Sequence, residues 1–339
     1  MYYNWEINIK KDELNNIVKL VQYGEVIIFP TETVYGIGAN ALDENAVKKV
    51  FEAKNRPKDN PLIVLVSKKE DIKNVAQNIS EIEQILIDNF MPGPFTLVLE
   101  KKESVPDIVS AGSNYVGIRI PDNKIAQEII ELSGVPIVGP SANISGKLSG
   151  TNAEDIKEEL EDKVSVIIDG GQTNIGIEST VVKVIDGVPT ILRPGKVTLE
   201  EIEKVVGKVK INDKNHDIKN PAIKYKHYTP LTKCRLIYSE IEDEQIELLN
   251  NQIVLNEKDI VVLAFEEHID KINLDKDKII TIGSNKNLET IMHNVFTAIR
   301  KADKCNSKLI LIEGVKKEGL GLAIMNRLVN ACGNDVIEK

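Results

Sequence analysis

The sequence predicts a protein of the α/β (α+β) class with two domains, and three observations lead to this prediction. The chain has 339 residues, more than one domain of ordinary size contains. Short apolar runs typical of buried strands alternate with segments of helical periodicity. The periodicity stops after about residue 205 and returns near residue 235. We therefore expect a larger domain over residues 1–207, a linker over 208–234 and a smaller domain over 235–339.

In the larger domain, helices and strands alternate in a way that favours a twisted sheet covered by helices. Helices are expected where apolar residues recur at three- and four-residue spacing, at residues 12–22, 43–54, 80–90, 123–133 and 153–161. Asp43 is the expected N-cap of the second of these helices. Strands are expected at the apolar runs 26–29, 63–66, 96–99, 116–120, 135–138, 164–168 and 180–184.

The smaller domain repeats this alternation on a reduced scale. Short apolar runs at 235–238, 260–264, 279–282 and 309–312 predict buried strands, and helices are expected at 286–303 and 321–332. Such an order favours a parallel, Rossmann-like sheet. No residue pattern in this domain indicates chemistry, so a regulatory, gating or oligomer-forming role is left open.

Composition limits the classes of function. The net charge of −9 argues against a non-specific nucleic-acid binder, which would have a basic surface. The three cysteines and four histidines are far apart, so neither a disulfide framework nor a metal site formed by protein side chains is expected. The first ten residues lack the apolar core of a signal peptide, and no apolar run approaches the roughly 20 residues that span a bilayer. The expected location is the cytoplasm.

Two glycine-containing segments fall short of known phosphate-binding loops. Gly36, Gly38 and Ala41 fit a dinucleotide fingerprint, but residues 31–35 lie between the proline that ends the preceding strand and the first glycine, so the tight turn is missing. In the segment at 139–148 the glycine spacing is too long for a Walker A loop, and Leu148 stands where a hydroxyl would hold magnesium. A bound nucleotide would therefore need another kind of cradle.

Polar and cationic side chains follow several of the predicted strands. Ligands of open α/β sheets collect at strand ends, and cations together with hydroxyl and amide groups suit an anionic ligand. Each of these residues taken alone is equally compatible with an exposed end or a turn. Arg119 is more informative, because it lies within an apolar strand and a buried arginine needs an anionic partner. The polar segments are 30–36, 54–57, 141–143 and 178–180, with Arg119 and Arg193.

Together these segments resemble the Sua5/YrdC/YwlC family of threonylcarbamoyl-AMP synthases. The resemblance is carried by PTETVYGIG (30–38), KNRPKDNPL (54–62), VGIRIPD (116–122), GPSANISG (139–146), DGGQTNIGIESTVV (169–182) and LRPG (192–195). The segment at 224–230 and the segment at 319–328 resemble the junction and the C-terminal motif of the long, two-domain Sua5 type. The resemblance thus implies a YrdC-like twisted mixed sheet with helices, followed by a Rossmann-like Sua5 domain.

The resemblance implies a nucleotidyltransferase reaction. L-Threonine, bicarbonate or CO2 and ATP, with Mg²⁺ accompanying ATP, would give threonylcarbamoyl-adenylate and pyrophosphate. A separate transferase would then modify adenosine 37 of tRNAs that read ANN codons; direct contact of this chain with tRNA is left open. Nucleotidyl transfer of this kind depends mainly on positioning and charge stabilisation.

The resemblance also assigns site residues. Lys54 and Arg56 are the expected catalytic cations, and they bind ATP together with Ser141, Asn143, Arg193, His227 and Tyr228. Arg119 is expected to hold the threonine carboxylate, since its planar fork suits that group. The remaining residues expected in the threonine pocket are Thr33, Tyr35 and Ser179.

Three points remain open in the sequence. The linker is either a flexible tether or a lid in which His227 and Tyr228 approach the nucleotide and exclude water. The family often has a histidine where this chain has Leu65, which puts in question how the amino acid is recognised. The rival functions are a non-catalytic RNA-binding protein and a carbamoyl-phosphate-handling maturation factor, whose zinc-finger cysteines this chain lacks.

Overall fold

The computed structural model describes residues 1–5, 9–212, 228–256 and 259–339 of the chain. These residues divide into two units. The first unit comprises Met1–Ser145 and Ser149–Tyr225, and the second comprises Gly146–Leu148 and Lys226–Lys339.

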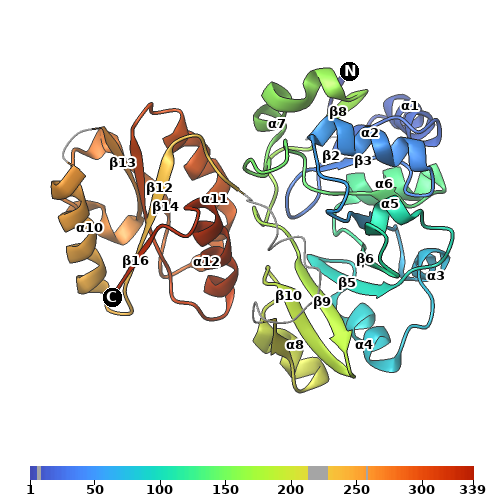
Figure 1. Ribbon diagram of the computed structural model, residues 1–339. Helices are drawn as coiled ribbons and strands as arrows, with labels where there is room; N and C mark the ends of the chain where they lie inside the picture. Colours follow the sequence, from blue (N-terminus) through green and yellow to red (C-terminus); the bar gives the residue numbers. More distant parts are fainter. Residues whose placement is uncertain (6–8, 213–227, 257–258) are drawn as a thin grey trace. The chain divides into compact units, whose positions relative to one another are not determined.

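Helices and strands alternate through the first unit (Figure 1). The helices are α1 (Lys11–Gln22), α2 (Glu44–Lys54), α3 (Ile72–Val75), α4 (Glu81–Phe90), α5 (Asp107–Ser110), α6 (Lys124–Ser133), α7 (Ala153–Leu160) and α8 (Leu199–Val206). The strands are β1 (Tyr2–Asn4), β2 (Ile27–Phe29), β3 (Gly36–Gly38), β4 (Ile63–Leu65), β5 (Phe95–Glu100), β6 (Tyr115–Arg119), β7 (Ile137–Val138), β8 (Val166–Asp169), β9 (Thr180–Ile185), β10 (Val188–Arg193) and β11 (Lys210–Ile211).

These strands form two mixed sheets. The larger has the order β11-β10-β9-β5-β6-β4-β7, and the smaller has the order β1-β8-β2-β3. Strands distant in the chain pair directly, as β5 does with β9 in parallel and β4 with β6 in parallel. Such pairings bring segments from the whole length of this unit to a common sheet edge.

The two sheets meet where β3 lies beside β7. Isolated bridges join Asn40 to Ile137 and Gly36 to Ser141. Gly38 lies at this junction, where a β-carbon would stand 2.3 Å from the carbonyl oxygen of Val138. Since the obstructing atom belongs to the backbone, the close approach of the two strands requires glycine at this position.

Apolar side chains on the two faces of the sheets form two cores. One contains residues of α2, α4 and the larger sheet, including Phe51, Leu86 and Phe95. The other lies between the strands and the paired helices α1 and α6, and includes Ile17, Ile129 and Leu65. Alternate residues of β4 enter different cores, as expected for a strand buried on both faces.

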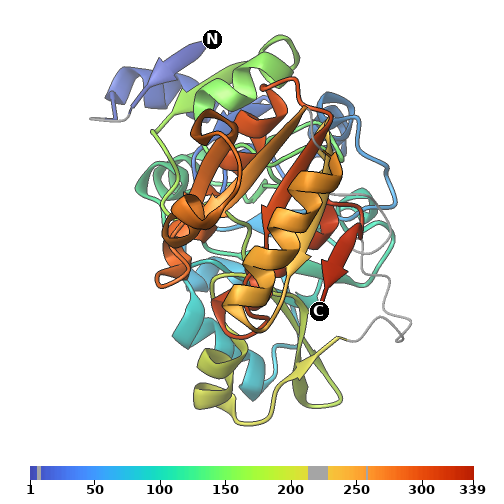
Figure 2. The same ribbon diagram turned by 90° about the vertical axis from the view of Figure 1, so that its left-hand side faces the viewer.

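The second unit contains one sheet whose pairings are all parallel, in the order β14-β13-β15-β12-β16. Helix α10 packs on one face and helices α11 and α12 on the other, as Figures 1 and 2 show. The strands are β12 (Lys233–Tyr238), β13 (Ile260–Phe265), β14 (Ile279–Gly283), β15 (Leu309–Glu313) and β16 (Val336–Glu338). The helices are α10 (Glu242–Asn256), α11 (Leu288–Asp303) and α12 (Leu320–Ala331).

Every helix and strand predicted above has a counterpart within a few residues of its expected bounds. Asp43 caps α2 as expected, since its carboxylate accepts from the backbone N–H groups of Asn45 and Ala46. The α/β class and the parallel sheet of the smaller domain are confirmed.

The elements that were not predicted from the sequence are β1, β3, α3, α5, β10, α8, β11, α10 and β16. Glycines dominate β3, and in α10 the exposed Val254 and Leu255 blur the apolar face.

The expected linker also differs from the structure at both ends. Lys210 and Ile211 form β11, which extends the larger sheet beyond residue 207, and β12 begins at Lys233.

Candidate active site

One edge of the larger sheet brings together five strand ends of the first unit. Strands β4, β6 and β10 end there, and β5 and β9 begin there, because β5 pairs antiparallel with β6 and parallel with β9. Arg119 is the last residue of β6, Ser179 precedes β9, and Arg193 ends β10. Three side chains predicted for the site from separate segments therefore share this edge.

Arg119 is buried and forms an ion pair with Glu32. Its Nη2 lies 2.7 Å from Oε2 of Glu32, and its Nε donates to the carbonyl of Gly93 at 3.2 Å. The expectation of an anionic partner for this arginine is confirmed, and the structure identifies the partner as Glu32. The ion pair also attaches the segment at 30–36 to the sheet edge.

Ser179 and Arg193 are hydrogen-bonded to each other. The Arg193 guanidinium donates to the carbonyl of Ser179 at 2.9 Å and to its hydroxyl at 3.3 Å. The Ser179 hydroxyl also lies 2.8 Å from that of Thr96 on β5. A residue expected on the threonine side and one expected on the nucleotide side are thus direct neighbours.

A second cluster forms at the end of α2. The Lys54 ammonium donates to the carbonyl oxygens of Ser141 and Asn143, the latter at 2.7 Å. The Ser141 hydroxyl donates to Oδ1 of Asn143 at 2.6 Å. The Arg56 guanidinium is held by the side chain and the carbonyl of Asn60 and by the carbonyl of Pro61. Lys54, Ser141 and Asn143 therefore form one hydrogen-bonded set, and the binding of phosphate by this set stays a prediction.

The electrostatics of this cluster favour an anion. Burial lowers the pKa of Lys54 well below its usual value, and the neighbouring Arg56 guanidinium lowers it further. Glu159 and Glu178 act in the opposite direction. A bound polyphosphate would favour the charged form of Lys54, because opposite charges attract strongly at a buried position.

The segment at 30–38 connects the two clusters. At one end Glu32 pairs with Arg119, and at the other Gly36 is bridged to Ser141 while the carbonyl of Tyr35 accepts from the N–H of Ala142. A single stretch of nine residues thus contacts both the Arg119 edge and the loop that Lys54 holds. This contact makes the two clusters parts of one site.

Thr33 and Tyr35 are buried within this connecting segment. The hydroxyl of Thr33 lies 2.9 Å from that of Thr31. The hydroxyl of Tyr35 donates to the carbonyl of Gly171 and accepts from the N–H of Gly170, and burial raises the pKa of its phenol. In the structure Tyr35 fixes the loop after β8, so its assignment to the threonine pocket stays a prediction.

Tyr228 belongs to the second unit. Its ring centre lies 5.1 Å from that of Phe296 and 5.7 Å from the Arg327 guanidinium carbon. His227 falls outside the described residues, as does most of the expected lid. Whether His227 and Tyr228 bind ATP stays a prediction.

Leu65 is 2% exposed and packs in the core beside α1 and α6, against the backbone of Gly139. A β-carbon on Gly139 would stand 2.4 Å from the Leu65 side chain. The residue that departs from the family pattern therefore fills apolar space in this chain.

Three residues of the site were given no role from the sequence: Glu32, Thr96 and Glu178. Glu178 is buried and accepts a hydrogen bond from the Ser149 hydroxyl, which joins the loops before β9 and before α7. The signal for Glu32 was its position beside two threonines after a buried strand, since an acidic residue that follows such a strand needs a cationic partner.

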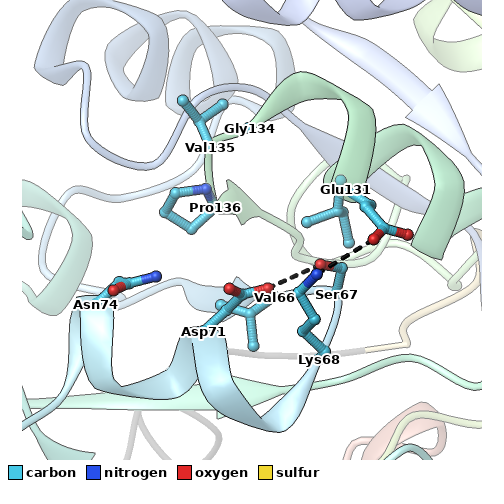
Figure 3. A pocket seen from close by; sticks show the side chains of 10 residues that line it. Val66, Ser67, Lys68, Asp71, Asn74, Glu131, Gly134, Val135 and Pro136 are labelled. Carbon is cyan, nitrogen blue, oxygen red and sulfur yellow. Dashed lines mark hydrogen bonds and ion pairs between the residues drawn. The ribbon is translucent and has the colours of Figure 1, made fainter.

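A separate hollow in the first unit contains none of the predicted site residues (Figure 3). It lies between the segment after β4 and the end of α6. Its polar side chains satisfy one another, since the Ser67 hydroxyl donates to Asp71 at 2.8 Å and Lys68 pairs with Glu131 at 3.2 Å.

The described part of the chain contains no cluster of histidine, cysteine and carboxylate side chains that could hold a metal ion. Within the same residues, no helix has the length and apolar character that crossing a membrane requires.

The fold and the site define an α/β protein with mixed sheets, in which one connecting segment contacts both a buried arginine and the loop that a buried lysine holds. The Sua5–YciO–YrdC family model, described as telomere recombination, matches residues 19–195. The model of the threonylcarbamoyl-AMP synthase C-terminal domain matches residues 197–333. The chain belongs to the Sua5/YrdC family, in its two-domain form.

Named relatives agree with this assignment over almost the whole chain. The threonylcarbamoyl-AMP synthase of Pyrococcus abyssi is 43% identical over 94% of this chain and 93% of its own. That of Bacillus subtilis is 39% identical over 98% of this chain and 96% of its own. The crystal structure of P. abyssi Sua5 complexed with L-threonine superimposes with a TM-score of 0.92 and 41% identity, covering 100% of this chain and 99% of that one.

Proposed function

We propose that this chain is an L-threonylcarbamoyladenylate synthase. It condenses L-threonine, bicarbonate or CO2 and Mg²⁺-bound ATP into threonylcarbamoyl-adenylate and pyrophosphate. The observation that carries the proposal is the segment at 30–38, which contacts both the Arg119 edge and the loop held by Lys54. The names of the relatives and the bound L-threonine in the P. abyssi structure support the same substrate and product.

The reaction needs two anionic groups held close together. The threonine amine adds to CO2 to form a carbamate, and a carbamate oxygen then attacks the α-phosphorus of ATP, from which pyrophosphate leaves. The enzyme forms no covalent bond in this scheme, so its contribution is positioning and charge stabilisation. This suits a site made of buried cations, hydroxyls and amides.

The residues divide between the two substrates. Lys54, Arg56, Ser141 and Asn143 bind the phosphates of Mg²⁺-bound ATP, and the two cations stabilise the charge that develops on the leaving pyrophosphate. Arg119 binds the carboxylate of threonine through its guanidinium fork. The hydrogen bonds from Arg193 to Ser179 then connect the nucleotide side to the amino-acid side. Thr33, Tyr35 and Ser179 are assigned to the threonine pocket, and Arg193, His227 and Tyr228 are assigned to ATP binding.

The product places the chain at the first step of N6-threonylcarbamoyladenosine formation in tRNA. A mixed anhydride of this kind hydrolyses readily, so a separate transferase must take it up for transfer to adenosine 37.

The test is pyrophosphate release by the purified chain, with mass analysis of the product. ATP, L-threonine and bicarbonate are each omitted in turn. Release that requires all three, together with the mass of threonylcarbamoyl-adenylate, is the expected result. Release that persists without threonine, or tight ATP binding with no release under any condition, would contradict the proposal. Serine in place of threonine then probes the pocket.

A further inference from the structure

Glu32 is a buried carboxylate with unused hydrogen-bonding capacity at the centre of the candidate site. Its side chain is 6% exposed, and both of its carboxylate oxygens are buried and receive no hydrogen bond from the described chain. Arg119 faces it across 2.7 Å, but the N–H bonds of that guanidinium nitrogen are not directed at the carboxylate. The pair therefore compensates charge and leaves hydrogen bonds unmade, which is costly for a buried carboxylate.

The neighbouring donors are already engaged elsewhere. The Thr31 hydroxyl donates to the carbonyl of Val34 at 2.6 Å, so the Thr33 hydroxyl is left to donate to Thr31. The backbone N–H of Thr33 also points to the Thr31 hydroxyl. The Nε of Arg119 donates to Gly93. A donor for Glu32 must therefore come from outside these groups.

We infer that Glu32 binds the amino group of the amino-acid substrate, while Arg119 beside it binds the carboxylate. This inference rests on the proposed function and assigns a residue of that site which neither the sequence nor the family motifs had given a role. Glu32 would then be a specificity-determining residue that selects α-amino acids.

The charge arrangement fits an amino-acid zwitterion. Glu32 and Arg119 place an anion and a cation side by side. An α-amino acid likewise carries its anionic carboxylate and its cationic ammonium close together, because both are bonded to the same carbon atom. Laid against the pair, the ligand gives each buried charge an opposite charge and supplies N–H donors to Glu32. A carboxylic acid without the amino group would pair with Arg119 and would supply no hydrogen-bond donor to Glu32.

The test compares L-threonine with 3-hydroxybutanoate, which keeps the carboxylate, hydroxyl and methyl groups and lacks the amine. Binding of each to the full chain is measured by NMR titration, which reaches millimolar affinities. Glu32→Gln keeps the shape of the side chain and removes its charge. Glu25→Gln is the matched control, because Glu25 pairs with Lys49 on the surface, outside the candidate site.

We expect Glu32→Gln to lower the affinity for L-threonine about 10- to 100-fold, because a charge-assisted hydrogen bond is lost. The affinity for 3-hydroxybutanoate should stay within about twofold of the wild-type value. The control should bind both ligands as the wild type does. Should Glu32→Gln fail to fold, Glu32→Asp, which withdraws the carboxylate by one carbon, must show the same selective loss.

Equal weakening of both ligands would overturn the inference, since Glu32 would then act only by holding Arg119. Unchanged affinity for L-threonine would also overturn it. In both cases the wild type still binds L-threonine and the proposed function stands. A wild-type chain that binds no L-threonine would overturn the proposed function as well.

Discussion

Substitution of Arg119 tests the proposed binding of the amino acid most directly. It is buried at the end of β6, where it pairs with Glu32 and donates to the carbonyl of Gly93. Arg119→Ala should raise the threonine concentration needed for half-maximal rate by roughly 10- to 150-fold, because a charge-assisted contact contributes ~1.5–3 kcal/mol. ATP affinity should be unchanged.

Steady-state kinetics and ATP titration measure the two effects separately. The variant also leaves Glu32 without its ion-pair partner, so its thermal stability must be recorded beside the wild type. Loss of ATP affinity with an unchanged threonine requirement would mean that the two half-sites are assigned the wrong way round.

Lys54 has two roles that one substitution removes together. Its ammonium holds the carbonyls of Ser141 and Asn143, and its charge lies where the phosphates are proposed to bind. Lys54→Ala should therefore reduce pyrophosphate release at least tenfold, as loss of a charged contact does, while L-threonine binding persists. Lys48→Ala on the same helix is the control, since Lys48 forms only an exposed pair with Glu44. Turnover equal to that of the wild type would exclude Lys54 from the phosphate site.

At the scale of elements, the ends of parallel strands in the second unit carry a buried polar pair. His268 follows β13, and its Nδ1 lies 2.7 Å from Oε1 of Glu313 at the end of β15. Its Nε2 lies 3.2 Å from Glu242, which also pairs with Lys271. Burial lowers the pKa of His268, but the two carboxylates outweigh burial and raise the pKa above its usual value.

This shift gives the second unit a definite pH dependence. A histidine whose pKa is raised by folding contributes stability that is complete below about pH 6.5, its unfolded value, and that is lost as the pH rises through the folded value. We expect amide protection in β13 and β15 to fall between acidic and mildly alkaline pH. Hydrogen exchange with mass spectrometry, corrected for the intrinsic exchange rates, measures this protection.

His268→Asn should flatten that pH dependence in the full chain, and His293→Asn on α11 should preserve it. A His268→Asn variant with the wild-type pH slope would show that another group titrates. The slope is the decisive quantity, since the substitution also removes the contact between His268 and Glu313 and thereby lowers stability at every pH.

The whole molecule carries a net charge of −9, and this bears on the rival function as an RNA-binding protein. Buried cations such as Lys54 and Arg119 bind carbonyls and carboxylates of the chain and present little charge to a polyanion at the surface. We expect no retention of unmodified tRNA by the isolated chain at about 150 mM salt. A filter-binding series across salt concentrations checks this, and tight binding with a steep salt dependence would revive the rival function.

The two-domain organisation was visible in the sequence, and the bounds of the domains were not. The gap in periodicity after residue 205 marked the transition, because local pattern reports where helices and strands stop. Lys210 and Ile211 nevertheless pair with β10, since a two-residue strand has too little pattern to be seen without its partner. The residues Gly146–Leu148 belong to the second unit because of contacts with residues distant in the chain. The carbonyl of Gly146 accepts from the N–H of Thr229, and the carbonyl of Leu148 accepts from Arg300.

The sequence by itself determined the class of fold, most of the helices and strands, and the family motifs that name the candidate residues. These depend on periodicity, capping and the order of residues along the chain, all of which are local. It also required an anionic partner for Arg119, because a buried guanidinium cannot remain uncompensated.

Only the tertiary structure decided which groups meet. Glu32 reaches Arg119 and Lys54 reaches the loop after β7 although these groups lie far apart in the chain. Arg193 reaches Ser179 because β9 and β10 pair as neighbouring antiparallel strands. Strand pairing of this kind depends on packing summed over the whole unit, which no local pattern records. Leu65 is a further example. The sequence shows that a leucine stands at this position, but only the packing of the whole unit shows that its side chain fills the core beside α1 and α6.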